Sequence, residues 1–292
     1  MLDYFLQQLA NGLAAGSVYA LVAVGYSLIY SILELVNFAH GDIYMFGSFV
    51  VLTVYLVTKN FALAVVVGAA VSCTVGMTVE RIAYRPVRGA NRVAPMISAV
   101  GAALIIRNLA QVLWGTRTYP FPAVLPQRMI QIGNVTMSTL QISIFGLAMA
   151  LMIVFSLLVN KTKLGCAVRC VAQDIPTSRL MGIPVNRIIS LVYGAGAVLG
   201  VFGGVLFAVY YNSVFIGMGF LGTMKAWTAA IIGGIGNIYG ACLGGLLLGI
   251  VECLASGYIS SAYRDAISFG LLIIVLLIRP SGIMGRRVAE KV

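Results

Sequence analysis

Charged residues are scarce in this sequence. Only 9% of its 292 residues are charged, whereas 61% are hydrophobic, and the mean hydropathy is +1.01. An ordinary soluble domain has about 25% charged residues, and a chain with so few could not cover its apolar surface in water. The composition therefore excludes a soluble enzyme or a soluble binding module and predicts an integral membrane protein.

Residues that carry chemistry are also scarce. Histidine occurs once, at His40, and there are eight acidic residues and five cysteines. Cys166 and Cys170 stand four apart, a spacing that matches no zinc pattern, and no Ser or Cys nucleophile motif surrounds His40. The sequence contains no GxxxxGK[ST] phosphate-binding loop. We therefore expect no catalytic residue, no metal and no cofactor in this chain.

Long hydrophobic runs, in contrast, are abundant. A helix needs roughly 20 apolar residues to cross a bilayer, whereas a barrel would show alternating strands of about ten residues. Helices also satisfy their own backbone hydrogen bonds in lipid. The chain is predicted to be an all-α polytopic membrane protein, a helical bundle of eight to ten spans with broken glycine-rich helices, in a single domain over 1–292. The runs are 6–30, 43–58, 61–79, 94–114, 140–159, 188–210, 226–256 and 266–278.

The basic residues gather in three regions, 81–92, 161–187 and 279–291, which hold 13 of the 19. The positive-inside rule places these regions in the cytoplasm and explains the net charge of +11 without nucleic acid. The N-terminus is then predicted periplasmic and the C-terminus cytoplasmic, so 213–256 is expected to hold an extra crossing or a broken helix. The first run lacks signal-peptide features and is expected to be retained. The 13 residues are Arg81, Arg85, Arg88, Arg92, Lys161, Lys163, Arg169, Arg179, Arg187, Arg279, Arg286, Arg287 and Lys291.

Glycine is frequent, with 33 residues. Many lie four apart, as Gly245 and Gly249 do, a spacing that lets helix backbones approach closely in lipid. The stretch GGIGNIYG (233–240) allows two interpretations: tight helix packing, or a helix broken at membrane depth beside a transport pathway. On the second interpretation the pathway residues here are Gly233, Gly234 and Gly236.

Ionisable residues near or within the runs indicate functional sites, because charge is costly inside a bilayer. The stretch LELVNFAHGDIY (33–44) is either a plain cytoplasmic turn or an unwound segment that lines a cavity. Arg107 either packs with a buried partner or contacts substrate, and Glu252 has a possible role in a proton relay. The residues of 33–44 assigned to a substrate pathway are Asn37, Phe38, His40, Gly41 and Asp42.

The polar insert 161–187 separates two apolar runs. Asp174 is a good N-cap, Pro176 would fall in a first helical turn, and Gly182 suits a left-handed C-terminal position. The insert is therefore predicted to form two short helices along the membrane face, with a merely interfacial loop as the alternative. Arg169, Asp174 and Arg179 are expected to face the cytosol. The apolar residues expected to rest against the bundle are Val168, Val171, Ile175, Leu180, Met181 and Ile183.

Six stretches together resemble one family, the permease components of bacterial branched-chain amino acid ABC importers (LivH family). The insert also resembles the coupling loop of ABC importer permeases more widely. The resemblance covers nearly the whole chain. The stretches are GSVYALVAVGYSLIY (16–30), VNFAHGDIYMFGS (36–48), ERIAYRPVR (80–88), GCAVRCVAQDIPTSRLMGIPVNRI (165–188), KAWTAAIIGGIGNIYGACLGGLLLGIVE (225–252) and LLIRPSGIMGR (276–286).

The resemblance implies a multi-pass inner-membrane subunit of an importer for leucine, isoleucine or valine. It implies a homologous second permease (LivM-like), two ATPase subunits (LivG-like and LivF-like) that bind ATP and Mg²⁺, and a periplasmic amino-acid-binding protein. The missing phosphate-binding loop agrees with ATP hydrolysis on partner subunits. The residues expected to couple the permease to the ATPases are Gly165, Arg169, Ala172, Asp174, Arg179 and Gly182.

Other functions stay open at this point. A permease of the same superfamily could carry urea, a short amide or another amino acid. A stand-alone secondary transporter or channel would need no ATPase and no capped double-helix insert. An inert scaffold is disfavoured, because broken glycine-rich spans serve no purpose in an anchor.

Overall fold

The computed structural model describes residues 2–91, 93–124, 128–132 and 135–285. This part of the chain forms eleven α-helices, and eight of its helical segments are long and apolar enough to cross a membrane. The predicted all-α membrane fold is confirmed. Arg92, Arg286, Arg287 and Lys291 lie outside the described residues.

The helices are α1 (Leu2–Leu33), α2 (Ala39–Thr58), α3 (Phe61–Val79), a π-helical turn (Glu80–Tyr84), α4 (Val93–Trp114), α5 (Thr139–Lys161), α6 (Lys163–Gln173), α7 (Ile175–Leu180), α8 (Val185–Tyr211), α9 (Met218–Gly233), α10 (Ile238–Tyr258), a 3₁₀ turn (Ser261–Tyr263) and α11 (Arg264–Ile278). The strands are β1 (Tyr119–Pro120), β2 (Met129–Ile132), β3 (Val135–Ser138) and β4 (Ser213–Val214). β1 pairs with β4 and β2 with β3, both antiparallel. The sequence did not predict these strands.

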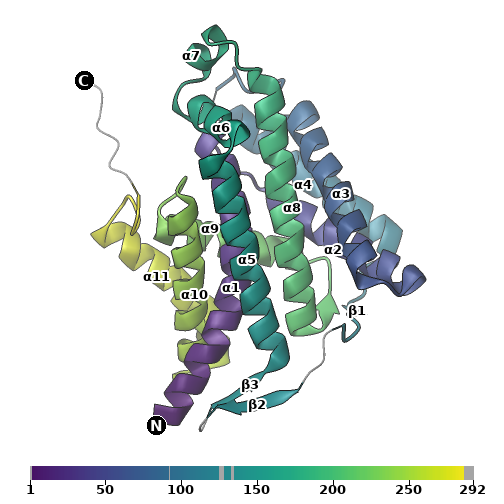
Figure 1. The fold of residues 1–292 in the computed structure, drawn as a ribbon, viewed down its shortest axis with the longest axis vertical. Helices are drawn as coiled ribbons and strands as arrows, with labels where there is room; N and C mark the ends of the chain where they lie inside the picture. Colours follow the sequence, from purple (N-terminus) through teal and green to yellow (C-terminus); the bar gives the residue numbers. More distant parts are fainter. Residues whose placement is uncertain (1, 92, 125–127, 133–134, 286–292) are drawn as a thin grey trace.

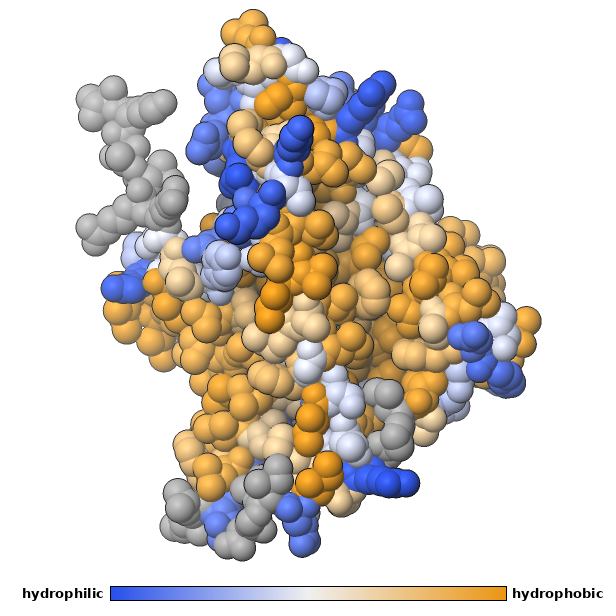
Figure 2. Space-filling model, in the orientation of Figure 1, coloured by the Kyte–Doolittle hydropathy of each residue, from blue (hydrophilic) through white to orange (hydrophobic). Residues whose placement is uncertain are grey.

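Helices α1 and α8 occupy the centre of the bundle (Figure 1). In α1, 94% of the apolar 18-residue segment is buried, and in α8 78% of the corresponding segment is buried. The same fraction is only 17% in α5 and 11% in the span that contains α11. The peripheral helices thus present apolar side chains outward, as helices in contact with lipid or with another subunit do. Figure 2 shows this apolar surface between two ends with more hydrophilic residues.

The two ends of the bundle are distinct. One end carries the paired strands β2 and β3, and we call it the hairpin end (Figure 1). There Gln7 Nε2 donates to the carbonyl of Thr136 on β3 at 2.8 Å, and Thr136 N–H donates back to Gln7 Oε1 at 2.9 Å. The opposite end carries α6 and α7, and we call it the α6–α7 end (Figure 1). There the N–H groups of Ile283 and Met284 donate to the carbonyls of Ile232 and Gly233, both at 2.9 Å. The first and last described residues therefore lie at opposite ends.

The region 213–256 contains two helices rather than one. α9 has only 16 residues, and a break at 234–237 separates it from α10. Gly234 and Gly236 have φ angles of +109° and +83°, a backbone region that favours glycine. The expected break is confirmed, whereas the apolar run 226–256 is not one continuous helix. α9 is the additional segment that brings the chain back to the α6–α7 end.

Glycines at four-residue spacing bring α1 and α10 into direct backbone contact. A Cβ added at Gly12 would lie 2.6 Å from Ile250 Cα, and one added at Gly249 would overlap the backbone of Gly16. The tight-packing interpretation of these glycines is confirmed. By contrast, a Cβ added at Gly146 on the outer helix α5 meets nothing within 4 Å.

This difference predicts opposite results for two identical substitutions. Gly249→Leu should force α1 and α10 apart and destabilise the protein by about 1–3 kcal/mol or more, the usual cost of overpacking. Gly146→Leu should change stability by less than about 0.5 kcal/mol, as substitutions at open positions do. Thermal unfolding of both purified variants in detergent measures the difference, and equal melting temperatures would contradict the packing described here.

Candidate functional site

The insert between α5 and α8 folds as two short helices, as predicted. Thr162 caps α6, its side chain accepting from Gly165 N–H, so the helix begins at Lys163 rather than after Gly165. Asp174 caps α7: its Oδ1 accepts from Thr177 N–H at 3.1 Å and its Oδ2 from the Thr177 hydroxyl at 2.6 Å. Gly182 ends the insert with φ +79°. The three residues expected to face solvent, Arg169, Asp174 and Arg179, are exposed.

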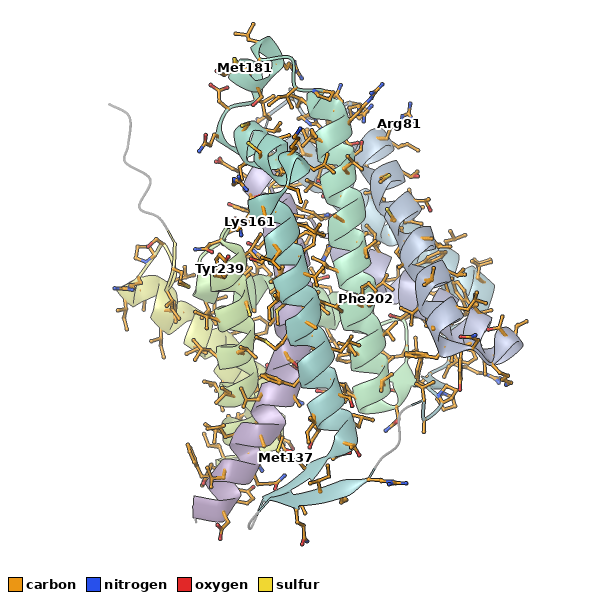
Figure 3. The ribbon with its side chains drawn as sticks, in the orientation of Figure 1. Arg81, Met137, Lys161, Met181, Phe202 and Tyr239 are labelled. Atoms are coloured by element: carbon orange, nitrogen blue, oxygen red, sulfur yellow. The ribbon has the colours of Figure 1, made fainter. Side chains whose placement is uncertain are left out.

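The apolar residues of the insert divide into two groups. Val171 is buried, and Val168, Ile175 and Ile183 pack against the core. Leu180 and Met181, however, are 87% and 77% exposed, so the expectation that they rest against the bundle is wrong. α7 is a single short helix that projects beyond the bundle, and no described part of the chain covers its C-terminal end. Figure 3 shows Met181 at this outermost point.

α6 is fixed to the end of α5 by close contacts. A Cβ on Gly165 would overlap the carbonyl of Val159, so a glycine is required there for the two helices to approach. The Arg169 guanidinium donates to the same carbonyl, which satisfies an acceptor at the α5 C-terminus. A displacement of α6 must therefore move the end of α5.

An open hollow of about 540 Å³ lies beside α6 at the same end of the bundle. Arg169 and Ala172 contribute from α6, and Glu34 follows the end of α1. Gly236 contributes from the α9–α10 break and Tyr239 from the first turn of α10. Figure 3 shows Tyr239 and Lys161 at this level. The hollow brings one residue of the broken helix, Gly236, next to two expected coupling residues. Gly233 and Gly234 do not line it; they pack against Gly240 and Gly285.

The stretch 33–44 is not an exposed turn. α1 ends at Leu33, and Asn37, His40 and Asp42 are at most 1% exposed. Asn37 Oδ1 accepts from the Tyr84 hydroxyl at 2.9 Å, and a Cβ on Gly41 would overlap Gly219 and Thr223 of α9. Among the described residues, neither of the two main hollows is lined by residues 37–42. This part of the chain is packed interior, with Phe38 half-buried beside it.

Asp42 of α2 and Arg107 of α4 form a bidentate ion pair. Arg107 Nε and Nη2 donate to the two Asp42 carboxylate oxygens, each at 3.0 Å. The Arg107 guanidinium also lies 6.0 Å from the centre of the Phe220 ring on α9. Arg107 therefore has a buried partner, the first of the two interpretations given above. An isolated arginine at this depth would be costly, and the pairing removes most of that cost.

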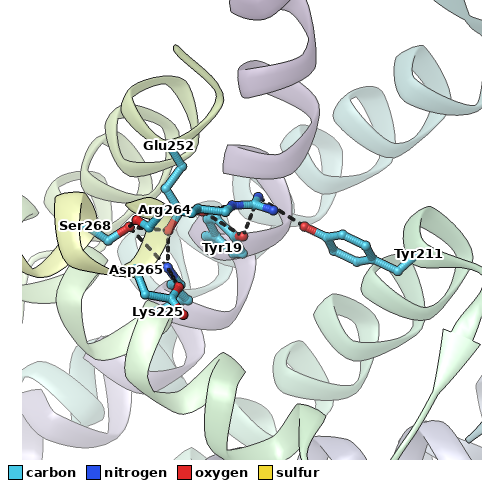
Figure 4. A network of polar contacts seen from close by, with 7 residues as sticks. All are labelled: Tyr19, Tyr211, Lys225, Glu252, Arg264, Asp265 and Ser268. Atoms are coloured by element: carbon cyan, nitrogen blue, oxygen red, sulfur yellow. Dashed lines mark hydrogen bonds and ion pairs between the residues drawn. The ribbon is translucent and has the colours of Figure 1, made fainter. Parts of the chain in front are cut away.

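Glu252 lies in a network of charged groups drawn in Figure 4. Its carboxylate is fully buried and accepts from Lys225, Ser268, Arg264 at 2.9 Å and Tyr19 at 3.0 Å. Two further contacts extend the network: Lys225 pairs with Asp265 at 2.7 Å, and Arg264 donates to the Tyr211 hydroxyl at 3.1 Å. Two cations thus balance two anions on three helices, α9, α10 and α11, and the two tyrosines connect them to α1 and α8. The carboxylate is fully hydrogen-bonded, which favours a structural role over a proton relay.

A second charged cluster lies at the α6–α7 end. Glu80 is buried and accepts from Arg85 at 3.0 Å and from Arg88 at 2.5 Å. Ser190 of α8 donates to the same carboxylate. Burial lowers the pKa of the Arg88 guanidinium from its ordinary value, and the Glu80 carboxylate opposes that shift. The cluster joins the end of α3 to the start of α8.

The sequence alone does not reveal most of the residues that surround Glu252. Tyr19, Tyr211, Asp265 and Ser268 come from positions up to 249 residues apart along the chain, and no local motif connects them. The signal that was present is the occurrence of Lys225, Glu252 and Arg264 close to or within apolar runs, where ionisable residues require partners.

Comparison with known proteins identifies the fold described above. The profile of the family described as "Branched-chain amino acid transport system / permease component" matches residues 8–276. The chain belongs to this permease family. The match takes in the α6–α7 insert and all or most of each span.

Two relatives of this family are similar over almost their whole length. One is the high-affinity branched-chain amino acid transport system permease protein BraD of Pseudomonas aeruginosa, 40% identical over 99% of this chain and 98% of that protein. Another is LivH of Escherichia coli K12, with the same description, 38% identical over 99% and 98%. A solved structure, PsaBC from Streptococcus pneumoniae in complex with Fab, has a TM-score of 0.53 at 13% identity and covers 96% of this chain and 97% of that one. That likeness concerns the fold alone.

Proposed function

We propose that this chain is the membrane permease subunit of an ATP-driven importer that carries leucine, isoleucine and valine. The observation that carries the proposal is the similarity, over nearly the full length, to permeases described as high-affinity branched-chain amino acid transporters. The few fixed charges of the spans agree with a pathway for zwitterions that have apolar side chains. The chain acts as one permease domain over 1–292 and hydrolyses no ATP itself.

The proposed partners follow from the same family. A homologous LivM-like permease, LivG-like and LivF-like ATPases and a periplasmic binding protein complete the importer. The α6–α7 end is assigned to the cytoplasm and the hairpin end to the periplasm. The described parts of the three basic regions lie at the α6–α7 end, and the positive-inside rule places such regions in the cytoplasm. The exposed apolar side chains of Leu180 and Met181 support docking of an ATPase there, because they lie among polar residues beyond the spans.

The proposed mechanism begins at α6 and α7. An ATPase that closes on ATP pushes this pair of helices, and the contacts of Gly165 and Arg169 with Val159 transmit the push to α5. The hollow beside α6 then changes shape, because α6, α1 and the α9–α10 break form its walls. Rigid helix movement of this kind moves access from one side of a membrane to the other.

The substrate pathway is proposed to run along the α9–α10 break and the α1–α2 connection. Gly233, Gly234 and Gly236 permit the break, and the buried group Asn37, His40 and Asp42 lies where α1, α2 and α9 meet. Polar side chains gathered at discontinuous helices are typical of transporter binding sites.

Uptake by the reconstituted importer tests the proposal. Proteoliposomes with the complete complex, ATP inside and the binding protein outside should accumulate labelled leucine. Unlabelled isoleucine and valine should compete, and urea should not. Competition by urea or a short amide alone would assign another cargo, and uphill uptake by the purified chain without ATPase subunits would contradict the importer assignment.

A further inference from the structure

A second open hollow, of about 640 Å³, lies at the α6–α7 end between the end of α3 and the start of α8. Three arginines line it: Arg81 from the π-helical turn, Arg85 directly after that turn, and Arg187 from the first turn of α8. Figure 3 shows Arg81 at this end of the bundle, on the far side of α8 from Tyr239. We call this hollow the arginine pocket; it is separate from the hollow beside α6.

The charges in the arginine pocket do not balance. Glu80 already accepts from Arg85 and Arg88. Within the described part of the chain, Arg81 and Arg187 form no ion pair with any acid. The positive end of the 27-residue helix α8 adds to the field. The pocket therefore attracts an anion that the described residues do not supply.

The side of the pocket that faces the middle of the bundle is apolar. Met77 precedes Arg81 by one helical turn and Leu191 follows Arg187 by one turn, so both lie deeper along their spans and line the same hollow. Leu191 is 44% exposed, and the neighbouring Ile82 is 70% exposed. The basic part thus lies at the ends of two spans, where lipid headgroups are found, and the apolar part continues toward the lipid chains.

We propose that the arginine pocket binds an anionic phospholipid. The phosphate is held by Arg81 and Arg187, with Arg85 beside them, and an acyl chain lies against Met77 and Leu191. Basic pockets between membrane helices are known to bind anionic headgroups. The apolar wall favours a lipid over free phosphate and over an acidic protein surface. This site is independent of the transported cargo.

Native mass spectrometry of the full chain, purified with its partner subunits in detergent, tests the proposal. Phosphatidylglycerol should bind more tightly than phosphatidylcholine. The double variant Arg81→Gln/Arg187→Gln should lower the phosphatidylglycerol affinity about 30-fold, because each basic residue near an anionic headgroup contributes about fivefold. Arg81→Lys/Arg187→Lys should retain most of the affinity. The matched control Lys59→Gln/Arg117→Gln removes two exposed basic residues outside the pocket and should change nothing.

The competing occupants give different results. Displacement by millimolar inorganic phosphate, or equal affinity for phosphatidylcholine, would overturn the lipid assignment. So would loss of the partner subunits in the glutamine variant with unchanged lipid binding, since the pocket would then be a protein contact. If the glutamine variant does not fold, the unmodified protein still tests the proposal. Its affinity for phosphatidylglycerol should fall with added salt, because salt screens charge, while its affinity for phosphatidylcholine stays constant. A salt-independent preference would overturn the proposal.

Discussion

Glu252→Gln is expected to destabilise the protein by about 3–5 kcal/mol, the usual effect of removing one partner of a buried charge network. Lys225 and Arg264 both donate to this carboxylate, and Lys225 is only 10% exposed at its side chain. The neutral amide leaves a net positive charge inside the bundle. One side of the amide is also an N–H donor, and it would face another donor where the carboxylate oxygen had accepted a hydrogen bond. Thermal unfolding of the purified variant in detergent measures the loss.

Two further variants separate the network from simple packing. Asp265→Asn should have a much smaller effect, because the Asp265 side chain is 63% exposed and water replaces its contact with Lys225. Lys225→Met combined with Glu252→Gln should recover part of the stability lost in Glu252→Gln alone, since the uncompensated cation is then absent. Equal destabilisation by Glu252→Gln and Asp265→Asn would contradict the assignment of Glu252 as the central acceptor.

The double substitution Leu180→Asp/Met181→Asp is expected to lower transport by roughly 100-fold or more without unfolding the chain. Both side chains are exposed, so their loss costs the isolated fold little. If they anchor the ATPase, removing two apolar anchors worth roughly 2 kcal/mol each weakens docking strongly, and carboxylates there add a desolvation cost. Leucine uptake, together with the amount of ATPase that co-purifies, measures the effect.

A matched control is available at the opposite end of the bundle. Met129 on β2 is 76% exposed, almost as much as Met181, and Met129→Asp should leave ATPase co-purification unchanged. Leucine uptake at the normal rate in the Leu180→Asp/Met181→Asp variant would contradict the proposed docking of an ATPase on α7. Loss of ATPase in the Met129 variant would show that the effect does not depend on position.

The α6–α7 insert illustrates how far local sequence signals reach. The cap at Asp174 and the left-handed Gly182 were predicted because each depends on the residue's own backbone preference and on neighbours within three positions. The position of Leu180 and Met181 was predicted wrongly. An apolar side chain indicates burial only on average, and nothing in the local sequence says whether a short helix has a surface to rest on.

The residues assigned to the substrate pathway show the same difference between what local sequence predicts and what packing decides. A break within 213–256 was one of the two expected alternatives, because glycine-rich stretches interrupt the apolar run; the structure places it after Gly233, where Asn237 caps α10. The burial of Asn37 and His40 was left open, because a polar stretch between two spans fits an exposed turn equally well. Only the packing of α2 against α8 and α9, with the His40 ring beside Tyr26 of α1, places these side chains inside.

The sequence by itself determined that the chain lies in a membrane as a helical bundle. It favoured two capped helices between α5 and α8, and it predicted a broken helix or an extra crossing within 213–256. Composition, run length and capping are local properties, and lipid leaves the backbone few alternatives. Tertiary structure alone decided that Asp42 pairs with Arg107, that Glu252 joins Lys225 to Arg264, and that Arg81 meets Arg187 in one pocket. The partner of a buried charge is selected by which helices pack together, and that depends on contacts between residues far apart in the chain.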